Sequence, residues 1–197
     1  IYEKPSVINT PAKHMAVTVP EINTDGKSGD VAIISNCEKD DEQLKNMIAR
    51  FQTQCTRKTR VINIAEYEFK GGCLGCFGCA ADGKCIYRDG FDTFLREEIQ
   101  SADAIVYAFT IRDHSMGARM KMYDDRQFCN GHRTVTMGSP TAYLIHGDLA
   151  AEANLRTVIE GRADVGRNFL AGIATDAGNL GTVADSLVYA LENRVSL

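Results

Sequence analysis

Short apolar runs and amphipathic stretches alternate along the chain from residue 31 onward. The run 31–35 (VAIIS) is continuously apolar, which is typical of a parallel strand buried on both faces. Leu44, Met47, Ile48 and Phe51 follow at the spacing of one helical face. The same alternation predicts further strands at 60–66, 104–110, 141–147 and 168–175, and helices near 91–99, 116–128, 150–164 and 179–193.

Five strand–helix units in one chain predict an α/β, three-layer fold, with a five-stranded parallel sheet and helices on both faces. Ligands of such folds bind beyond the carboxyl ends of the strands. Residues 1–30 differ from the rest, because three of the four prolines lie there among polar residues. We therefore expect an N-terminal arm or linker at 1–30 and one folded domain at 31–197.

Composition narrows the class of protein. Hydrophobic residues make up 44% of the 197 residues and charged residues 24%, which is an ordinary globular balance. The net charge of −4 leaves no basic surplus for a nucleic-acid backbone, so nucleic acid is not an expected partner. No apolar run approaches the roughly 18 residues that span a bilayer, and no signal peptide is recognisable. We expect a cytoplasmic protein that does not bind membranes.

Four of the seven cysteines crowd into one short segment with the spacing C-x2-C-x2-C-x5-C: Cys73, Cys76, Cys79 and Cys85. An odd, clustered count favours metal or redox chemistry over a disulfide framework. Thiolates suit iron–sulfur clusters or zinc, and three cysteines at steps of three are closer to ferredoxin-like ligation than to paired zinc knuckles. The spacing alone leaves three interpretations open: an iron–sulfur cluster, a zinc ion, or thiols without a metal.

The stretch 71–110, which begins GGCLGCFGC, resembles a segment of the NADPH-dependent FMN reductase and iron–sulfur flavoprotein family. In that family a cysteine loop leads to a helix and then to a strand. The resemblance covers roughly residues 31–193 and implies a flavodoxin-like fold with FMN as cofactor. It also implies NAD(P)H or reduced ferredoxin as electron donor, and a 4Fe–4S cluster on the four cysteines.

The resemblance also implies where the flavin binds. The loop after the first strand would hold the FMN phosphate, the segment TIRDHSMG would contact the flavin ring, and the loop after the fourth strand would lie against it. The corresponding residues are Ser35, Asn36, Cys37, Thr110, Ile111, Arg112, Asp113, His114, Ser115, Met116, Gly117, Gly147 and Asp148. Lys121 and Arg126 would be structural.

Two positions depart from the family pattern. The first loop carries Glu38, Asp40, Asp41 and Glu42, where the family has a small and often basic loop. These acids oppose a phosphate, although acids are also ordinary residues of a first helical turn. The second departure is Ile111, where the family usually has proline, and we expect it to reshape the flavin-ring loop.

The sequence thus predicts a flavin-dependent, NAD(P)H-dependent FMN reductase-like oxidoreductase, with a small-molecule or protein electron donor and acceptor. No catalytic side chain is expected, because the flavin itself carries the electrons. The family resemblance favours a homo-dimer or homo-tetramer. Two alternatives stay open: a non-enzymatic electron-transfer flavoprotein, and a degenerate flavodoxin-like module without cofactor.

Overall fold

Five strands form one parallel sheet in the order β2-β1-β3-β4-β5. The computed structural model describes residues 30–131, 135–175 and 178–193. The strands are β1 (Asp30–Ser35), β2 (Lys58–Asn63), β3 (Ala104–Thr110), β4 (Pro140–His146) and β5 (Phe169–Thr175). This strand order is that of flavodoxin-like folds and confirms the predicted fold class. The expected N-terminal arm lies outside the described residues, apart from Asp30, which begins β1.

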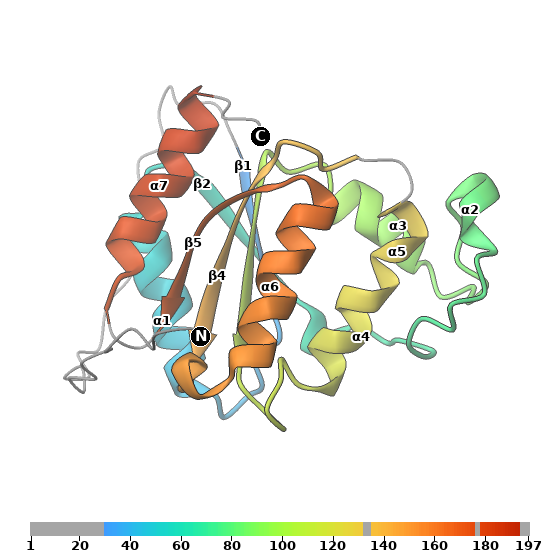
Figure 1. Cartoon of the computed structure of the whole chain (residues 1–197), viewed down its shortest axis with the longest axis horizontal. Helices are drawn as coiled ribbons and strands as arrows, with labels where there is room; N and C mark the ends of the chain where they lie inside the picture. The colour runs from blue at the N-terminus through green and yellow to red at the C-terminus, as the bar shows by residue number, and fades with distance from the viewer. Residues whose placement is uncertain (1–29, 132–134, 176–177, 194–197) are drawn as a thin grey trace, which may run out of the picture.

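Helices cover both faces of the sheet (Figure 1). On one face lie α1 (Glu42–Gln54) and α7 (Leu180–Asn193). On the other lie α3 (Phe91–Phe94), its continuation η2 (Leu95–Ile99), α4 (Ala118–Arg126) and α6 (Ala153–Gly166). Successive side chains of β1 enter opposite layers: Val31 and Ile33 pack toward α1 and α7, and Ala32 and Ile34 toward the other helices. Within the described part of the chain, no helix is long and apolar enough to cross a membrane.

The short elements adjust the predicted boundaries. They are η1 (Ile64–Glu66), α2 (Cys79–Asp82), α5 (Phe128–Gly131) and η3 (Leu149–Ala151). The second strand was predicted to reach residue 66, but it ends at Asn63. The Asn63 side chain accepts a hydrogen bond from the Ala65 amide at 3.1 Å and begins the 3-10 turn η1. The helix predicted at 116–128 ends at Arg126, and α5 follows as a separate turn.

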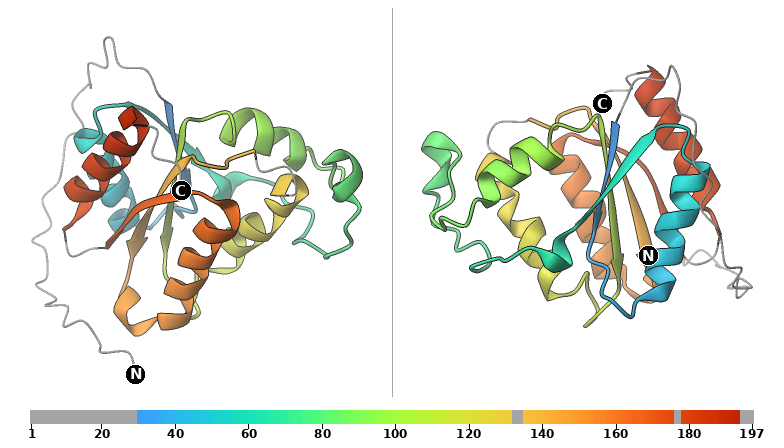
Figure 2. Two further views of the ribbon diagram at one scale, coloured as in Figure 1. Left: turned by 45° about the horizontal axis from the view of Figure 1, so that its top comes forward. Right: turned by 180° about the vertical axis from the view of Figure 1, so that it is seen from behind.

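Two regions of the molecule are positioned by this topology. The carboxyl ends of β1, β3 and β4 lie side by side, since Ser35 pairs with Ala108 and Thr110 with His146. The segment 71–89, called the cysteine loop below, projects from the body beside α5 (Figure 2). Helix α4 separates the two regions. It starts near the strand ends, and its last residue, Arg126, lines a pocket formed by the cysteine loop. Nine residues make it about 13 Å long, so the two regions are distinct sites within one chain.

Candidate functional site

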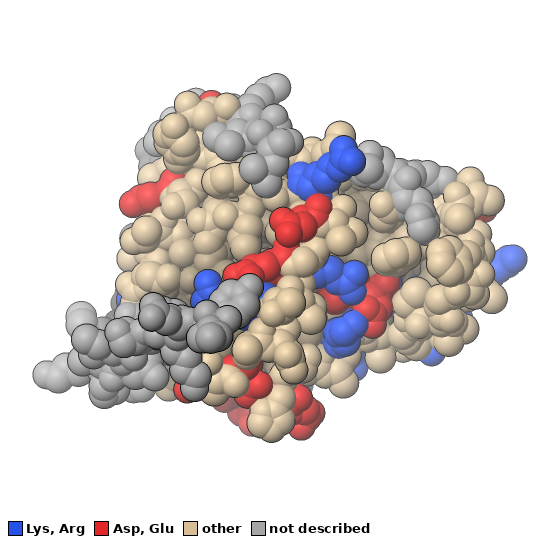
Figure 3. All heavy atoms as spheres, in the orientation of Figure 1, with Lys and Arg blue, Asp and Glu red and all other residues tan. Residues whose placement is uncertain are grey.

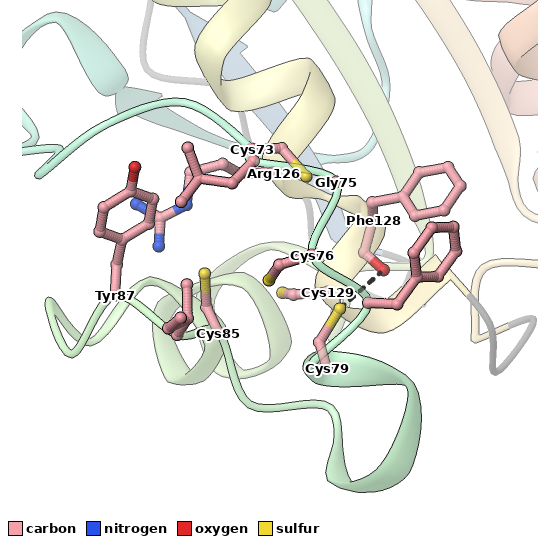
Figure 4. A pocket seen from close by; sticks show the side chains of 12 residues that line it. Cys73, Gly75, Cys76, Cys79, Cys85, Tyr87, Arg126, Phe128 and Cys129 are labelled. Atoms are coloured by element: carbon pink, nitrogen blue, oxygen red, sulfur yellow. Dashed lines mark hydrogen bonds between the residues drawn. The ribbon is translucent and has the colours of Figure 1, made fainter.

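The four predicted cysteines come together around one cavity of about 60 Å³ (Figure 4). Cys73 and Cys76 are exposed, and Cys79 and Cys85 are half-buried. A fifth cysteine, the buried Cys129 of α5, also lines this cavity. The Cys79 thiol donates to the carbonyl oxygen of Phe128 at 3.9 Å, which joins the cysteine loop to α5. Spacing could not reveal Cys129, because it lies far along the chain from the motif.

The cavity has room for more than a single water molecule. Among the described residues, no group of three or more His, Cys, Asp or Glu side chains is placed to hold one metal ion. Tetrahedral zinc, with bonds of about 2.3 Å, would need the sulfur atoms about 4 Å apart. The thiols instead surround a space larger than the ~10–15 Å³ that one water requires. A multi-atom group therefore has room between the thiols.

A buried arginine forms part of the cavity wall. The Arg126 side chain is 0% exposed and makes two hydrogen bonds to the Asp89 carboxylate, at 2.5 and 2.8 Å. Its guanidinium lies 4.6 Å from the centre of the Phe91 ring and 5.0 Å from that of Tyr87. The buried Nε has no hydrogen-bond partner among the described residues. Buried donors in native proteins are satisfied, and the cavity that Arg126 lines has room for an acceptor.

The same arginine closes the base of the cysteine loop. Besides Asp89 near the end of the loop, Arg126 donates to the carbonyl oxygen of Gly71 at its start, at 3.5 Å. Asp89 also accepts from the Lys70 amide at 3.2 Å, and its carbonyl accepts from the Tyr67 hydroxyl at 2.9 Å. The hydrogen bonds from Arg126 lower the pKa of Asp89 to about 2. Arg126 therefore has the structural role expected of it and also lines the pocket.

Burial sets the protonation of the pocket. It raises the pKa of the Cys79 thiol, and it raises that of Cys129 to about 12, with further contributions from Cys85 and Cys79. Burial by itself would lower the pKa of Arg126, but its interactions with Asp89 and Cys85 outweigh burial and raise it. The guanidinium is therefore charged, and binding of a metal by Cys79 must release its proton.

The second region is the edge formed by the strand ends. Residues 110–117, expected above to contact the flavin ring and called the ring loop below, form a tight hairpin. Arg112 and Ser115 of this loop exchange two backbone hydrogen bonds of 2.9 Å. Asp113 and His114, between them, have φ angles of 51° and 57°, as a type I′ turn requires. The His114 ring makes a 2.9 Å contact with Glu152, and this hydrogen bond raises the pKa of His114. Met116 is 3% exposed and packs in the core, so the loop presents Asp113 and His114 outward instead.

The departure at Ile111 has a physical reason. Its backbone N–H donates to the carbonyl oxygen of His146 at 2.9 Å, a bond that proline could not make. Its side chain covers Gly147, where an added Cβ would lie 3.2 Å from the Ile111 Cβ. Gly147 has φ +119°, which also disfavours any other residue. Asp148 accepts from the Ala150 amide at 3.0 Å and caps η3.

The first loop (residues 35–41) satisfies its own polar groups. The Ser35 hydroxyl accepts from the Cys37 backbone amide at 3.1 Å, and the Cys37 thiol donates to the backbone carbonyl of Glu38 at 3.5 Å. The Asn36 backbone amide donates to the carbonyl of Ala108 in β3 at 3.0 Å. The Asp41 carboxylate caps α1 by accepting from the Leu44 amide at 3.1 Å. The N-terminus of α1 is therefore capped by a carboxylate of the chain itself.

No known protein-family profile matches the chain. An iron–sulfur flavoprotein of Archaeoglobus fulgidus is 35% identical over 66 residues, a match that covers 34% of this chain and 30% of that protein. The similarity to this curated relative thus spans less than a third of its length.

Solved structures share the fold. The flavoenzyme FerB of Paracoccus denitrificans, an NAD(P)H:(acceptor) oxidoreductase, superposes with a TM-score of 0.56 at 15% identity, over 86% of this chain and 100% of that one. An NAD(P)H:quinone oxidoreductase of Methanothermobacter marburgensis gives 0.55 at 15% identity, over 85% and 98%. A WrbA-like flavodoxin of Agrobacterium tumefaciens gives 0.52 at 10%, over 85% and 98%. The chain therefore has the flavodoxin-like fold that these proteins share.

Proposed function

We propose that this protein is an electron-transfer oxidoreductase of the iron–sulfur flavoprotein type. Cys73, Cys76, Cys79 and Cys85 would hold a 4Fe–4S cluster, and a flavin at the strand-end edge would be the second redox group. NAD(P)H or reduced ferredoxin would be the electron source. The observation that carries the proposal is the convergence of four regularly spaced thiols on one cavity with a buried, charged arginine in its wall.

The residues of the pocket suit this role. A cluster held by four thiolates stores one electron at a time, at a potential set by charge, hydrogen bonds and solvent exposure. Arg126 would offset the negative charge of the cluster and offer its Nε–H as a hydrogen-bond donor. The shared fold and the segment similar to an iron–sulfur flavoprotein support the same proposal.

An apolar rim around the pocket favours a protein as electron donor or acceptor. Leu74 is 65% exposed and Ile86 61% exposed, and both line the cavity. In Figure 3 charges of both signs intermingle over the middle of the face, whereas the right-hand part, toward the cysteine loop, is mostly uncharged. Exposed apolar surface beside a functional site is typical of protein contacts. This exposed apolar rim supports a non-enzymatic electron carrier as the second candidate function. The same rim would also suit contact between identical chains, as a homo-dimer or homo-tetramer in the cytoplasm would need.

An anaerobic absorption spectrum, with iron, sulfide and flavin assays on the same sample, tests the proposal. We expect about four irons per chain, the content of one 4Fe–4S cluster. Cys85→Ser should lower the iron content, whereas Cys55→Ser, in the core between α1 and α7, should leave it unchanged. Fewer than about one iron per chain after anaerobic reconstitution would exclude the cluster. Bound flavin without oxidation of NADH or NADPH would favour the electron carrier over the enzyme.

A further inference from the structure

We infer that Asp41 takes the place of a ligand phosphate at the β1–β3 edge, so that this site selects a flavin without a terminal phosphate over FMN. The inference rests on the proposed function and specifies which flavin the site takes. In a sheet of this strand order, the ligand crevice lies where β1 and β3 are neighbours. The phosphate position of such a crevice is the N-terminus of the first helix, here α1.

The N-terminus of α1 already holds an anion. This helix has 13 residues, and its first amides and its dipole would favour a negative group. The Asp41 carboxylate meets that preference, because its Oδ1 accepts from the Leu44 amide at 3.1 Å. A phosphate would have to displace this internal cap before it could reach the same amides.

The second oxygen of the Asp41 carboxylate, Oδ2, bonds to the opposite side of the crevice, at the end of β3. The Thr110 hydroxyl, at the end of β3, donates to Asp41 Oδ2. This bond runs from the start of α1 to the start of the ring loop, across the two strands between which a ligand would enter. Arg112 of the ring loop forms a second link, with its guanidinium 3.2 Å from the Glu38 carboxylate. The Thr110 hydroxyl and the Arg112 cation, both from the ring loop, are thus paired with acids of the first loop.

Charge adds to this steric conflict. Asp41 places a negative charge at this position, and the Lys45 ammonium nearby along α1 is paired with Glu42 at 2.7 Å. A phosphate monoester carries about −1.5 to −2 charges at neutral pH. Repulsion between such a group and a carboxylate about 4 Å away weakens binding by about tenfold even in a water-like dielectric. The ribityl hydroxyls of riboflavin carry no charge and avoid this penalty.

The experiment compares riboflavin with FMN on the full chain. The dissociation constant of each is measured by quenching of flavin fluorescence. For the wild type, riboflavin should bind about tenfold more tightly than FMN. Asp41→Ser keeps a helix cap but removes the charge and shortens the side chain, so it should reverse the preference in favour of FMN. Asp40→Ser removes the same charge from an exposed position and should leave the ratio unchanged.

Every outcome decides the inference. A wild type that prefers FMN, or an Asp41→Ser ratio equal to that of the wild type, overturns it. If the wild type binds neither flavin, FMN binding gained by Asp41→Ser supports it, and no binding in either protein overturns it together with the flavin half of the proposed function. Iron content, measured on the same samples, decides the cluster separately. Asp41→Asn, which retains size and capping ability, replaces Asp41→Ser if that variant does not fold.

Discussion

The ion pair between Arg126 and Asp89 is expected to carry much of the stability of the cysteine loop. Both side chains are buried, at 0% and 3% exposure, and the contact is bidentate. Asp89→Asn keeps the size of the side chain but leaves the Arg126 guanidinium without a counter-charge. The pKa of Asp89 falls from 3.8 to about 2, which corresponds to about 2 kcal/mol at neutral pH. Removing one partner of a buried pair costs about 3–5 kcal/mol in other proteins.

Urea unfolding at pH 7 should therefore show a loss of between about 2 and 5 kcal/mol in Asp89→Asn. Because the pKa of Asp89 is depressed in the folded state, its contribution is present above pH 3.8 and is lost as the pH falls toward 2. The difference between wild type and variant should shrink across that interval. Iron uptake should also fall, since the pair holds both ends of the loop.

A matched control separates burial from charge. Glu160→Gln removes one partner of an exposed pair on α6, the 2.9 Å contact with Arg156, and should cost no more than about 0.5 kcal/mol. The reasoning would be refuted by an Asp89→Asn loss below about 1 kcal/mol. It would also be refuted by a difference from the wild type that persists at pH 2.

Three further predictions concern single contacts. Cys129→Ser should keep about four irons per chain, whereas serine at any of the four loop cysteines should lower the count in an iron assay. Ile111→Pro should lose about 1–3 kcal/mol in urea unfolding, because the His146 carbonyl loses its donor, while Ile111→Val should lose less. Glu152→Gln should return the pKa of His114 toward 6.5 in an NMR titration, since the contact with Glu152 raises it; an unchanged titration would contradict this. The ion pair between His114 and Glu152 is fully formed below pH 6.5, and it weakens as the pH rises through the raised pKa of His114.

The elements of the fold could be predicted from the sequence because their signals are local. Continuous apolar runs identified the central strands, and β3 matches its prediction at 104–110. The edge strand β2 was placed too late along the chain, since its partly exposed residues give a weaker apolar signal. The spacing of the four cysteines was likewise sufficient to indicate that they lie together, because a short loop keeps them near one another.

The candidate sites required the tertiary structure, because their decisive contacts join distant segments. Arg126 meets Asp89 across 37 residues, and Thr110 meets Asp41 across 69. Periodicity and spacing report on neighbours along the chain, whereas these pairings depend on strand order and on where α1 and α4 dock. The sequence by itself determined a parallel α/β sheet and a group of thiols. Only the folded chain decided that Arg126 and Cys129 line the thiol pocket, and that Asp41 caps α1 and accepts a hydrogen bond from Thr110.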